Sequence, residues 1–433
     1  MPKFIINGGK RLAGSIEVSS AKNSALALIC ASLLVKGRIV LRDVPQIEEV
    51  KRLIEVLQSI NVKCDWLSSH DLAIDSSAPL QMEKINQKIC AKMRSSLLLL
   101  GALSHRVPKY KLYKTGGCKL GERSVRPHLY ALEVFGVEVK SAADYYDVKN
   151  TARPGAEIVM YESGDTPTEN VIMSAVLAPG QSIIKFVSSN YMTQDLCFFL
   201  QKMGAKISGI GTTTLTIHGV SELKPIKEYF VMPDPIVAMT WISLAITTKS
   251  ELTIKNCPLD FLELELEKLK VMGQKFELKN KRKSKNKKFN IVDIIFFPSP
   301  LMALPDKIYG RPFPGLNIDN LPLFVPILTQ AKGRTLVHDW VYENRAVYYL
   351  DFQKIGAKIT LLDPHRVFVE GSTALEGRDL TAPDAIRPAM ALLIGMLAAK
   401  GQSILRNIYN IERGYEDLVE KLQAIGAKIK REE

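Results

Sequence analysis

A short pattern of polar and apolar residues recurs along the chain. An amphipathic helix leads into a glycine, and a strand of alternating polar and apolar residues follows. The pattern is clearest at residues 203–207, 355–359 and 425–429, each of which contains Gly-Ala-Lys-Ile. Weaker copies occupy residues 60–64, 135–139 and 272–276. Six copies of one structural unit are therefore predicted.

Each copy predicts the same local structure. The helix is illustrated by residues 415–424, whose apolar residues fall on one side of a helix. The glycine that follows suits the left-handed residue that commonly ends a helix. Short strands are predicted at 206–210 and 358–362, and second strands at 214–218 and 366–370. The unit is thus helix, strand, turn and strand, with a further helix before the next copy.

The six units are expected to group into two domains. Units of about 70 residues are each too small to bury a stable core, so we expect three in each of two α/β domains. Pro225 and the cluster 233–235 follow the third copy, where the chain would cross between domains. We predict a first domain at 22–231, and a second at 232–433 that the N-terminal segment 1–21 completes.

Composition excludes several classes of protein. Of the 433 residues, 46% are hydrophobic and 24% charged, and a mean hydropathy of +0.03 excludes a polytopic membrane protein. No apolar stretch is long enough for a spanning helix, and no signal peptide is visible. The six cysteines form no CxxC pair and the six histidines are scattered. Neither a disulfide framework nor a metal site is expected, and we predict a protein of the reducing cytoplasm.

Much of the net charge of +13 comes from one short segment. Seven cations stand in residues 279–288, within the longest interval between copies, so this run is interpreted as an insertion. One interpretation is a polybasic segment for nucleic acid or acidic lipid. The favoured one is a solvated, mobile loop between two strands, because no aromatic residues for base stacking interleave the cations. The mild excess elsewhere suits an enzyme with anionic substrates.

Residues that could take part in binding or catalysis lie in seven motifs. These are 19–26, 92–96, 116–123, 312–315 with Asp319, 341–345, Arg387 and 413–416. In these motifs and their order, the chain resembles the bacterial UDP-N-acetylglucosamine enolpyruvyl (1-carboxyvinyl) transferases from residue 4 to 430. The resemblance implies transfer of enolpyruvate from phosphoenolpyruvate to the 3′-hydroxyl of UDP-N-acetylglucosamine, the first committed step of peptidoglycan synthesis. It also implies two domains, each of three inverse βαβαββ repeats. No metal or organic cofactor is indicated.

Phosphoenolpyruvate carries a phosphate and a carboxylate, which several permanent cations must hold. Arginine suits this role, because its guanidinium binds such groups in a bidentate manner. The resemblance assigns the binding of phosphoenolpyruvate to Lys22, Asn23, Arg123, Arg387 and Arg413, with Arg94 as a weaker candidate. A lone arginine is more often a surface charge, but the motif around Arg413 favours function.

Cys118 lies in a segment, residues 115–123, that contains three glycines and is predicted to be a mobile loop. Lys119 and Arg123 would lower the pKa of its thiol. The resemblance implies that Cys118 protonates the vinyl carbon or assists product release, and that fosfomycin alkylates it. A loop of this kind can close over a site and exclude water.

Asp319 is the candidate base for the acceptor hydroxyl, because it takes the position of the family's aspartate. Nearby arginines would lower its pKa, so positioning is expected to supply more of the rate than basicity. The competing interpretation is a helix N-cap, and both roles can coexist. Lys22 completes the catalytic candidates beside Cys118 and Asp319.

The acceptor side departs most from the family pattern. The resemblance assigns UDP-sugar binding to Asn23, Arg94, Arg123, Arg126, His128, Asp319 and Val341. However, Asp165 would repel a diphosphate, Pro167 lacks an N–H donor, and Arg126 stands in place of an acid. Further departures lie at 235–237, Ile318 and 384–388.

Two acceptors remain open. UDP-N-acetylglucosamine is favoured, because Lys22, Asn23, Cys118 and Asp319 are all present. The alternative is a divergent paralogue that transfers enolpyruvate to another UDP-sugar or nucleotide. The partners are thus expected to be small molecules, and no oligomeric state is defined.

Three other functions are less well supported. A shikimate-phosphate enolpyruvyl transferase would share the fold and the donor, but Ala-Lys-Asn at 21–23 and the cysteine at 118 disfavour it. A nucleic-acid binder would rest on residues 279–288 alone. An inactive regulatory paralogue is disfavoured because no expected catalytic residue is missing.

Overall fold

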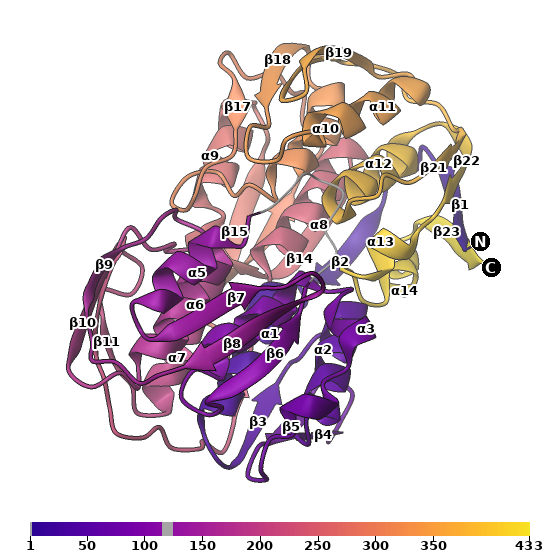
Figure 1. The fold of residues 1–433 in the computed structure, drawn as a ribbon. Helices are drawn as coiled ribbons and strands as arrows, with labels where there is room; N and C mark the ends of the chain where they lie inside the picture. The colour runs from indigo at the N-terminus through magenta and orange to yellow at the C-terminus, as the bar shows by residue number, and fades with distance from the viewer. Residues whose placement is uncertain (1, 115–123) are drawn as a thin grey trace. The chain divides into compact units, whose positions relative to one another are not determined.

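The computed structural model describes residues 2–114 and 124–433 (Figure 1). Its Cα positions divide into two units. The terminal unit holds residues 2–19 and 233–433, and the middle unit holds 20–114 and 124–232. A geometric division does not test independent folding. The domains 22–231 and 232–433 with 1–21 therefore remain predictions.

The middle unit packs its helices against three sheets around one core. α1 (Lys22–Ala31) is buried from Ser24 to Ala31, which suits its almost wholly apolar sequence. The core runs through apolar residues from Ala25 to Val231. The strand orders are β13-β3-β5-β4, β6-β8-β7 and β11-β12-β10-β9.

The middle unit contains further helices and strands. Its other helices are α2 (Glu48–Ser59), α3 (Gln87–Cys90), α4 (Leu99–Ala102), α5 (Arg126–Glu133), α6 (Asp165–Ala175) and α7 (Tyr191–Lys202). Its strands are β3 (Arg38–Arg42), β4 (Lys63–Trp66), β5 (Leu72–Asp75), β6 (Lys109–Tyr113), β7 (Val137–Ser141), β8 (Tyr145–Asn150), β9 (Glu157–Val159), β10 (Gln181–Lys185), β11 (Lys206–Ser208), β12 (Thr214–His218) and β13 (Tyr229–Phe230).

The terminal unit repeats this plan. α8 (Pro235–Thr247) is buried along its whole length, and α10 (Leu321–Gln330) and α12 (Ile386–Ala398) are nearly as enclosed. The strand orders are β15-β16-β14-β2, β17-β18-β20-β19 and β21-β22-β1-β23. The three long apolar helices are therefore the centre of this unit.

The other helices of the terminal unit are α9 (Glu263–Val271), α11 (Asp351–Lys354), α13 (Tyr409–Glu412), α14 (Leu418–Ala424) and the 3₁₀ helix η5 (Arg345–Leu350). Its strands are β1 (Lys3–Gly8), β2 (Ala13–Glu17), β14 (Glu251–Pro258), β15 (Phe276–Lys283), β16 (Asn290–Phe296), β17 (Ile308–Tyr309), β18 (Gly333–His338), β19 (Lys358–Asp363), β20 (Arg366–Gly371), β21 (Asp379–Thr381), β22 (Gly401–Arg406) and β23 (Lys428–Glu432).

The N-terminal strands belong to sheets built from the second half of the chain. β1 lies between β22 and β23 and is antiparallel to both, with Phe4 opposite Leu405 and Arg431. β2 runs parallel to β14, with Ile16 opposite Ile254. Residues distant in sequence therefore complete two of the sheets in the terminal unit.

The repeat predicted from the sequence is present in the backbone. Each of the six copies has a residue with positive φ two or three positions after the end of its helix, as predicted. These residues are Asn61 (71°), Gly136 (85°), Gly204 (107°), Gly273 (88°), Gly356 (98°) and Gly426 (94°). Asparagine tolerates this conformation better than most side chains, which explains the exception in the first copy.

The helix predicted at 415–424 is too long. α14 begins only at Leu418, because Asp417 has a φ of +48° and interrupts the helical path. Arg413 caps the end of α13, so residues 413–417 form the connection between two short helices. Likewise the strand predicted at 206–210 ends at Ser208, since Gly209 turns the chain with a φ of +81°.

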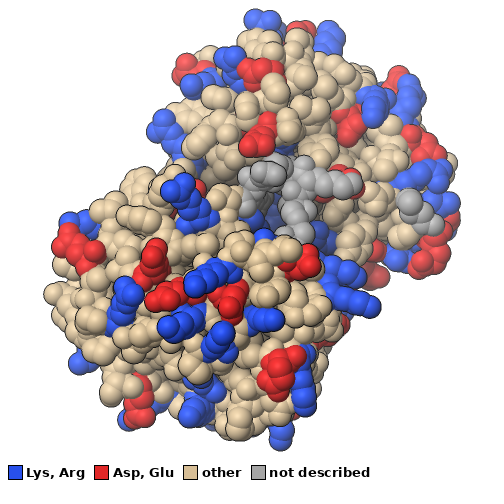
Figure 2. Space-filling model, in the orientation of Figure 1, with Lys and Arg blue, Asp and Glu red and all other residues tan. Residues whose placement is uncertain are grey.

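The basic run is not a loop between strands over its whole length. Residues 279–283 lie in β15, an exposed edge strand paired with β16, and only the remainder forms the turn. An edge strand with no buried face can consist largely of lysine, because its side chains stay in water. Arg282 Nη2 and Asn280 Nδ2 both donate to Asp293, at 2.9 Å. On the face drawn in Figure 2, lysines and arginines lie interspersed with acidic residues.

Within residues 2–114 and 124–433, no helix combines the length and apolar character that crossing a bilayer requires.

Candidate functional site

The two units each contain part of the predicted site, and each part is described by itself. Cys118 and Arg123, together with Lys119, lie outside the described residues. The middle unit carries Lys22, Asn23, Arg94, Arg126 and His128. The terminal unit carries Asp319, Val341, Arg387 and Arg413.

Lys22 is the first residue of α1 and is held by a carboxylate. Its Nζ lies 2.5 Å from Glu49 Oε2, and the two side chains are only 15% and 11% exposed. Glu49 stands in the first turn of α2, where the helix dipole favours an acid. The ammonium group of Lys22 therefore has a fixed position and is partly balanced by an anion.

The neighbouring Asn23 points to α7. Its Nδ2 donates to the hydroxyl of Tyr191 at 3.2 Å, and Tyr191 is fully buried. Because Tyr191 is the first residue of α7, this bond ties the starts of two central helices together. The backbone at Lys22 and Asn23 is thus positioned by the core.

His128 is a buried group within the middle unit. Burial, and secondarily the charge of Arg94, lowers the pKa of His128 to about 3, so the imidazole is neutral. Asn170 Nδ2 donates to Nδ1 at 2.9 Å, which leaves the proton on Nε2, 3.4 Å from Thr166 Oγ1. Asn170 also donates to the Leu97 carbonyl at 3.0 Å. His128 fixes α5 against α6, and its role as a nucleotide ligand remains a prediction.

The two arginines near His128 have different surroundings. Arg94 Nη2 donates to the Ser124 carbonyl at 3.1 Å. Arg126 begins α5, and its guanidinium carbon lies 5.7 Å from the ring centre of the exposed Tyr161. Tyr161 in turn lies 5.9 Å from the ring of Tyr130. An exposed cation and two aromatic rings therefore lie together.

Asp165 is not an isolated surface carboxylate. It is the first residue of α6 and accepts hydrogen bonds from Ser188 Oγ at 2.5 Å and Asn190 Nδ2 at 3.3 Å. Its charge is felt by the fully buried Glu169, whose pKa is raised first by burial and then by Asp165. The anion expected to oppose a diphosphate is present and firmly held.

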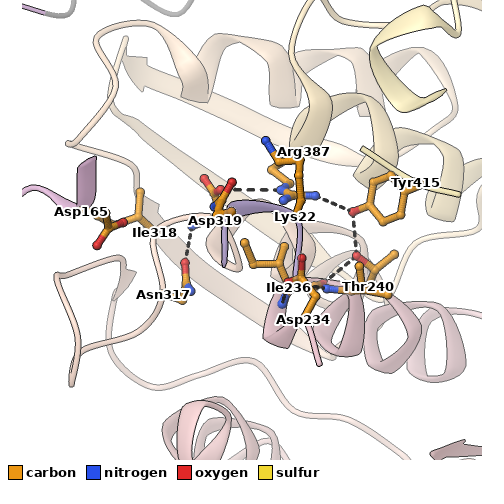
Figure 3. A network of polar contacts seen from close by, with 12 residues as sticks. Lys22, Asp165, Asp234, Ile236, Thr240, Asn317, Ile318, Asp319, Arg387 and Tyr415 are labelled. Atoms are coloured by element: carbon orange, nitrogen blue, oxygen red, sulfur yellow. Dashed lines mark hydrogen bonds and ion pairs between the residues drawn. The ribbon is translucent and has the colours of Figure 1, made fainter. Parts of the chain in front are cut away.

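Asp319 in the terminal unit faces two arginines. Arg345 Nη1 lies 3.5 Å from its Oδ1. Arg387 Nε lies 3.7 Å from its Oδ2 (Figure 3). Its own amide donates to Asn317 Oδ1 at 2.9 Å. The expectation that Asp319 caps a helix is wrong, because Asn320 occupies the N-cap position of α10. The carboxylate is instead directed at cations, as a base beside anionic substrates would be.

Arg387 is positioned by a chain of hydroxyl groups. Its Nη1 donates to Tyr415 Oη at 3.0 Å, and Tyr415 Oη lies 2.8 Å from Thr240 Oγ1 (Figure 3). Thr240 donates onward to the Ile236 carbonyl at 2.9 Å. Tyr415 therefore donates to Thr240 and accepts from Arg387. Arg387 is itself only 7% exposed.

Arg413 and Val341 are the other predicted residues of the terminal unit. The Arg413 guanidinium carbon is 6.0 Å from the ring of Tyr409. Val341 is half-buried in the bend before η5. Neither position argues for or against the predicted binding roles.

Sequence reasoning missed several residues that hold this part of the site. Arg345 and Tyr415 lie in the motifs 341–345 and 413–416, which indicate no role for them, and Asp339 and Thr240 carry no recognisable signal. Arg345 is buried and pairs with Asp339 at 2.6 Å. Burial is the largest single influence and opposes its charge, but Asp339, Tyr349 and Tyr342 together outweigh burial and raise the pKa of Arg345. Among the described residues, no group of three or more His, Cys, Asp or Glu could hold a metal ion.

Comparison with known proteins first defines the class. The structure matches the enolpyruvyl transferase NikO from Streptomyces tendae with a TM-score of 0.86 and 23% identity, over 100% of this chain and 99% of that one. A family model described as EPSP synthase (3-phosphoshikimate 1-carboxyvinyltransferase) matches residues 6–422. The fold is that of the enolpyruvyl transferases, and the predicted α/β fold class with six repeats is confirmed.

Curated relatives then narrow the family. Two proteins named UDP-N-acetylglucosamine 1-carboxyvinyltransferase are each 34% identical to this chain. The one from Bradyrhizobium diazoefficiens aligns over 99% of this chain and 98% of its own length, and the one from Bacteroides thetaiotaomicron over 100% of both. The chain belongs to the UDP-N-acetylglucosamine 1-carboxyvinyltransferases within the EPSP synthase family, as the motifs predicted.

Proposed function

We propose that this chain transfers the enolpyruvyl group of phosphoenolpyruvate to the 3′-hydroxyl of UDP-N-acetylglucosamine and releases phosphate. This reaction commits the nucleotide sugar to peptidoglycan synthesis, and hence serves cell shape and division, and we place it in the cytoplasm. The observation that carries the proposal is the carboxylate of Asp319 held between Arg345 and Arg387. A full-length likeness to relatives of that name supports the same reaction.

The donor has two anionic groups, and the proposed cations fit them. Lys22, Asn23, Arg123, Arg387 and Arg413 hold phosphoenolpyruvate. A buried arginine such as Arg387 binds an anion strongly, because little water competes for it. The hydrogen bond to Tyr415 fixes the direction of its guanidinium before the substrate arrives.

Asp319 acts as the base in this scheme. Its carboxylate accepts the proton of the acceptor hydroxyl while the hydroxyl oxygen attacks C2 of the enolpyruvyl group. A proton must reach C3 in the same addition, and Cys118 either supplies it or assists product release. Loss of phosphate and of a C3 proton then restores the double bond. By family resemblance, fosfomycin alkylates Cys118.

The acceptor is bound by a separate set of side chains. We assign UDP-sugar binding to Asn23, Arg94, Arg123, Arg126, His128, Asp319 and Val341. One observation favours the alternative acceptor, another UDP-sugar or a nucleotide. Asp165 is an ordered carboxylate at the start of α6, where helix amides would otherwise suit a diphosphate.

The test is inorganic phosphate release from phosphoenolpyruvate with a panel of UDP-sugars and UMP. Release with UDP-N-acetylglucosamine is expected, and Asp319→Asn should abolish it while binding of phosphoenolpyruvate persists. Release with another acceptor alone would establish the paralogue. An absence of release with every acceptor would refute the enolpyruvyl transfer itself.

A further inference from the structure

A buried ion pair lies directly behind Asp319. Asp339 follows β18 and Arg345 begins η5, and each side chain is 1% exposed. Arg345 Nε donates to Asp339 Oδ2 at 2.6 Å, and Nη2 donates to Oδ1 at 2.8 Å. Such a bidentate pair fixes the plane of the guanidinium.

The remaining donors of Arg345 are directed at the loop that carries Asp319. Nη2 also donates to the carbonyl of Ile318 at 2.7 Å. Nη1 faces Asp319 Oδ1 at 3.5 Å. Tyr349 donates its hydroxyl proton to Asp339 Oδ2 at 2.5 Å, so three donors hold the Asp339 carboxylate in place. Asp339 thus determines where Arg345 points.

The charges around Asp319 come from several elements. Arg345 of η5 and Arg387 of α12 face its carboxylate. Glu265 of α9 accepts from the amide of Asn317 and from Asn320 Nδ2, at 3.3 and 2.8 Å, on the residues that flank Ile318 and Asp319. The charge of Arg345 is balanced by Asp339, whereas Arg387 bonds to the neutral hydroxyl of Tyr415.

This difference matters for a base. A cation within about 6 Å of a carboxylate makes it a weaker base, and two uncompensated cations would weaken it further. A paired guanidinium still orients the carboxylate through its N–H groups but adds little net field. We propose that Asp339 is a positioning residue that cancels the charge of Arg345 and aims Nη1 at Asp319, so that Asp319 keeps the basicity needed to deprotonate the acceptor hydroxyl.

Three variants test this charge balance. Asp339→Asn leaves Arg345 uncompensated, Arg345→Gln leaves Asp339 uncompensated, and the double variant removes both charges. The acid limb of the kcat/KM profile for phosphate release should move to lower pH by about one unit in Asp339→Asn. It should move to higher pH in Arg345→Gln and stay at the parental position in the double variant.

The inference rests on the proposed function, so a second measurement is independent of activity. The carboxyl ¹³C resonance of Asp319, assigned through Asp319→Asn, can be titrated in each variant. Its midpoint should shift in the same directions as the acid limb. If the parent enzyme releases no phosphate but these midpoints shift as stated, the proposed function fails and the charge balance stands.

The double variant also guards against misfolding, because a neutral Asn–Gln pair is better tolerated than one buried charge. A double variant whose Asp319 midpoint moves by a full unit would overturn the proposal. Equal midpoints in the parent and all folded variants would do the same, since Asp339 would then be merely structural.

Discussion

Arg387 donates to the hydroxyl of Tyr415, and the guanidinium carbon lies 5.6 Å from the centre of the same ring. The two residues are far apart in sequence, yet both are buried. Tyr415 therefore fixes the position of the Arg387 guanidinium, which is proposed to bind phosphoenolpyruvate.

Tyr415→Phe should weaken the binding of phosphoenolpyruvate. The substitution keeps the ring but removes the acceptor for Arg387 Nη1 and the donor to Thr240. Because a hydrogen bond from a charged donor contributes about 1.5 kcal/mol or more, we expect the KM for phosphoenolpyruvate to rise at least about tenfold. Tyr145→Phe, in the middle unit, is the matched control and should change neither KM nor kcat. An unchanged KM in Tyr415→Phe would show that Arg387 holds its position without the hydroxyl.

Glu49→Gln should impair the reaction through Lys22. Without the carboxylate, the ammonium group loses a partner at 2.5 Å and the fixed position that this partner gives. We expect kcat/KM for phosphoenolpyruvate to fall about tenfold in steady-state assays. The neighbouring Glu48 pairs with Arg52 on the surface of the same helix, so Glu48→Gln should change the value less than twofold. A similar loss in both variants would point to the helix α2 and not to Lys22.

Asp195 should make the folded protein less stable as the pH rises. Burial raises its pKa to about 7, although hydrogen bonds from Tyr229 and the Met232 amide oppose the shift. The folded state then keeps a proton that the unfolded state releases near pH 4, so this contribution to stability is lost as pH rises from about 4 to 7.

The Asp195 contribution can be isolated by comparing urea unfolding of the parent and of Asp195→Asn. The free energy of unfolding of the variant, relative to the parent, should rise by about 1 kcal/mol or more between pH 4.5 and pH 7.5. Asp75→Asn is the control and should show a nearly constant difference over this window, because hydrogen bonds from Ser77 lower the pKa of Asp75 and it stays ionised above about pH 4.5 in both states. A pH-independent difference for Asp195→Asn would contradict the expected titration.

The acceptor site should respond to Asp165 and Arg126 in opposite ways. Asp165→Asn removes a negative charge while retaining an oxygen for Ser188, so the Kd for UDP-N-acetylglucosamine measured by calorimetry should fall. Arg126→Asp removes a cation near Tyr161 and should raise it. Asp144→Asn, in the turn before β8, provides the control. If neither variant alters binding and another acceptor supports turnover, the divergent paralogue is the correct interpretation.

The basic run should be dispensable for catalysis. Because residues 279–283 belong to β15, deleting the whole run would damage a sheet, so the test confines itself to the turn. Lys285→Gln, Lys287→Gln and Lys288→Gln combined should leave phosphate release unchanged. The parent protein should also not bind labelled single-stranded DNA at physiological salt, as measured by fluorescence anisotropy. Binding that weakens in the triple variant and with added salt would instead support a nucleic-acid partner.

The sequence predicts the repeated backbone well but the charge network poorly. Periodicity and the glycines at Gly204, Gly356 and Gly426 reveal the units because backbone geometry itself requires those residues. Asp417 at a φ of +48° carries no comparable signal, so the start of α14 was missed. The pairing of Asp339 with Arg345 was missed as well. It depends on how η5 turns back toward β18, which no local pattern records.

The position of β1 has a consequence for the order in which the protein is made. Residues 3–8 leave the ribosome long before their partners, which are residues 401–406 and 428–432. At synthesis rates of about 5–20 residues per second, β1 waits roughly 20 to 80 seconds for its neighbours. During that time both hydrogen-bonding edges of β1 are unpaired, while residues 20–232 can already leave the ribosome and collapse. β1 is therefore translated long before it can pair, and a nascent chain stalled before residue 400 would expose it to any chaperone that binds extended segments.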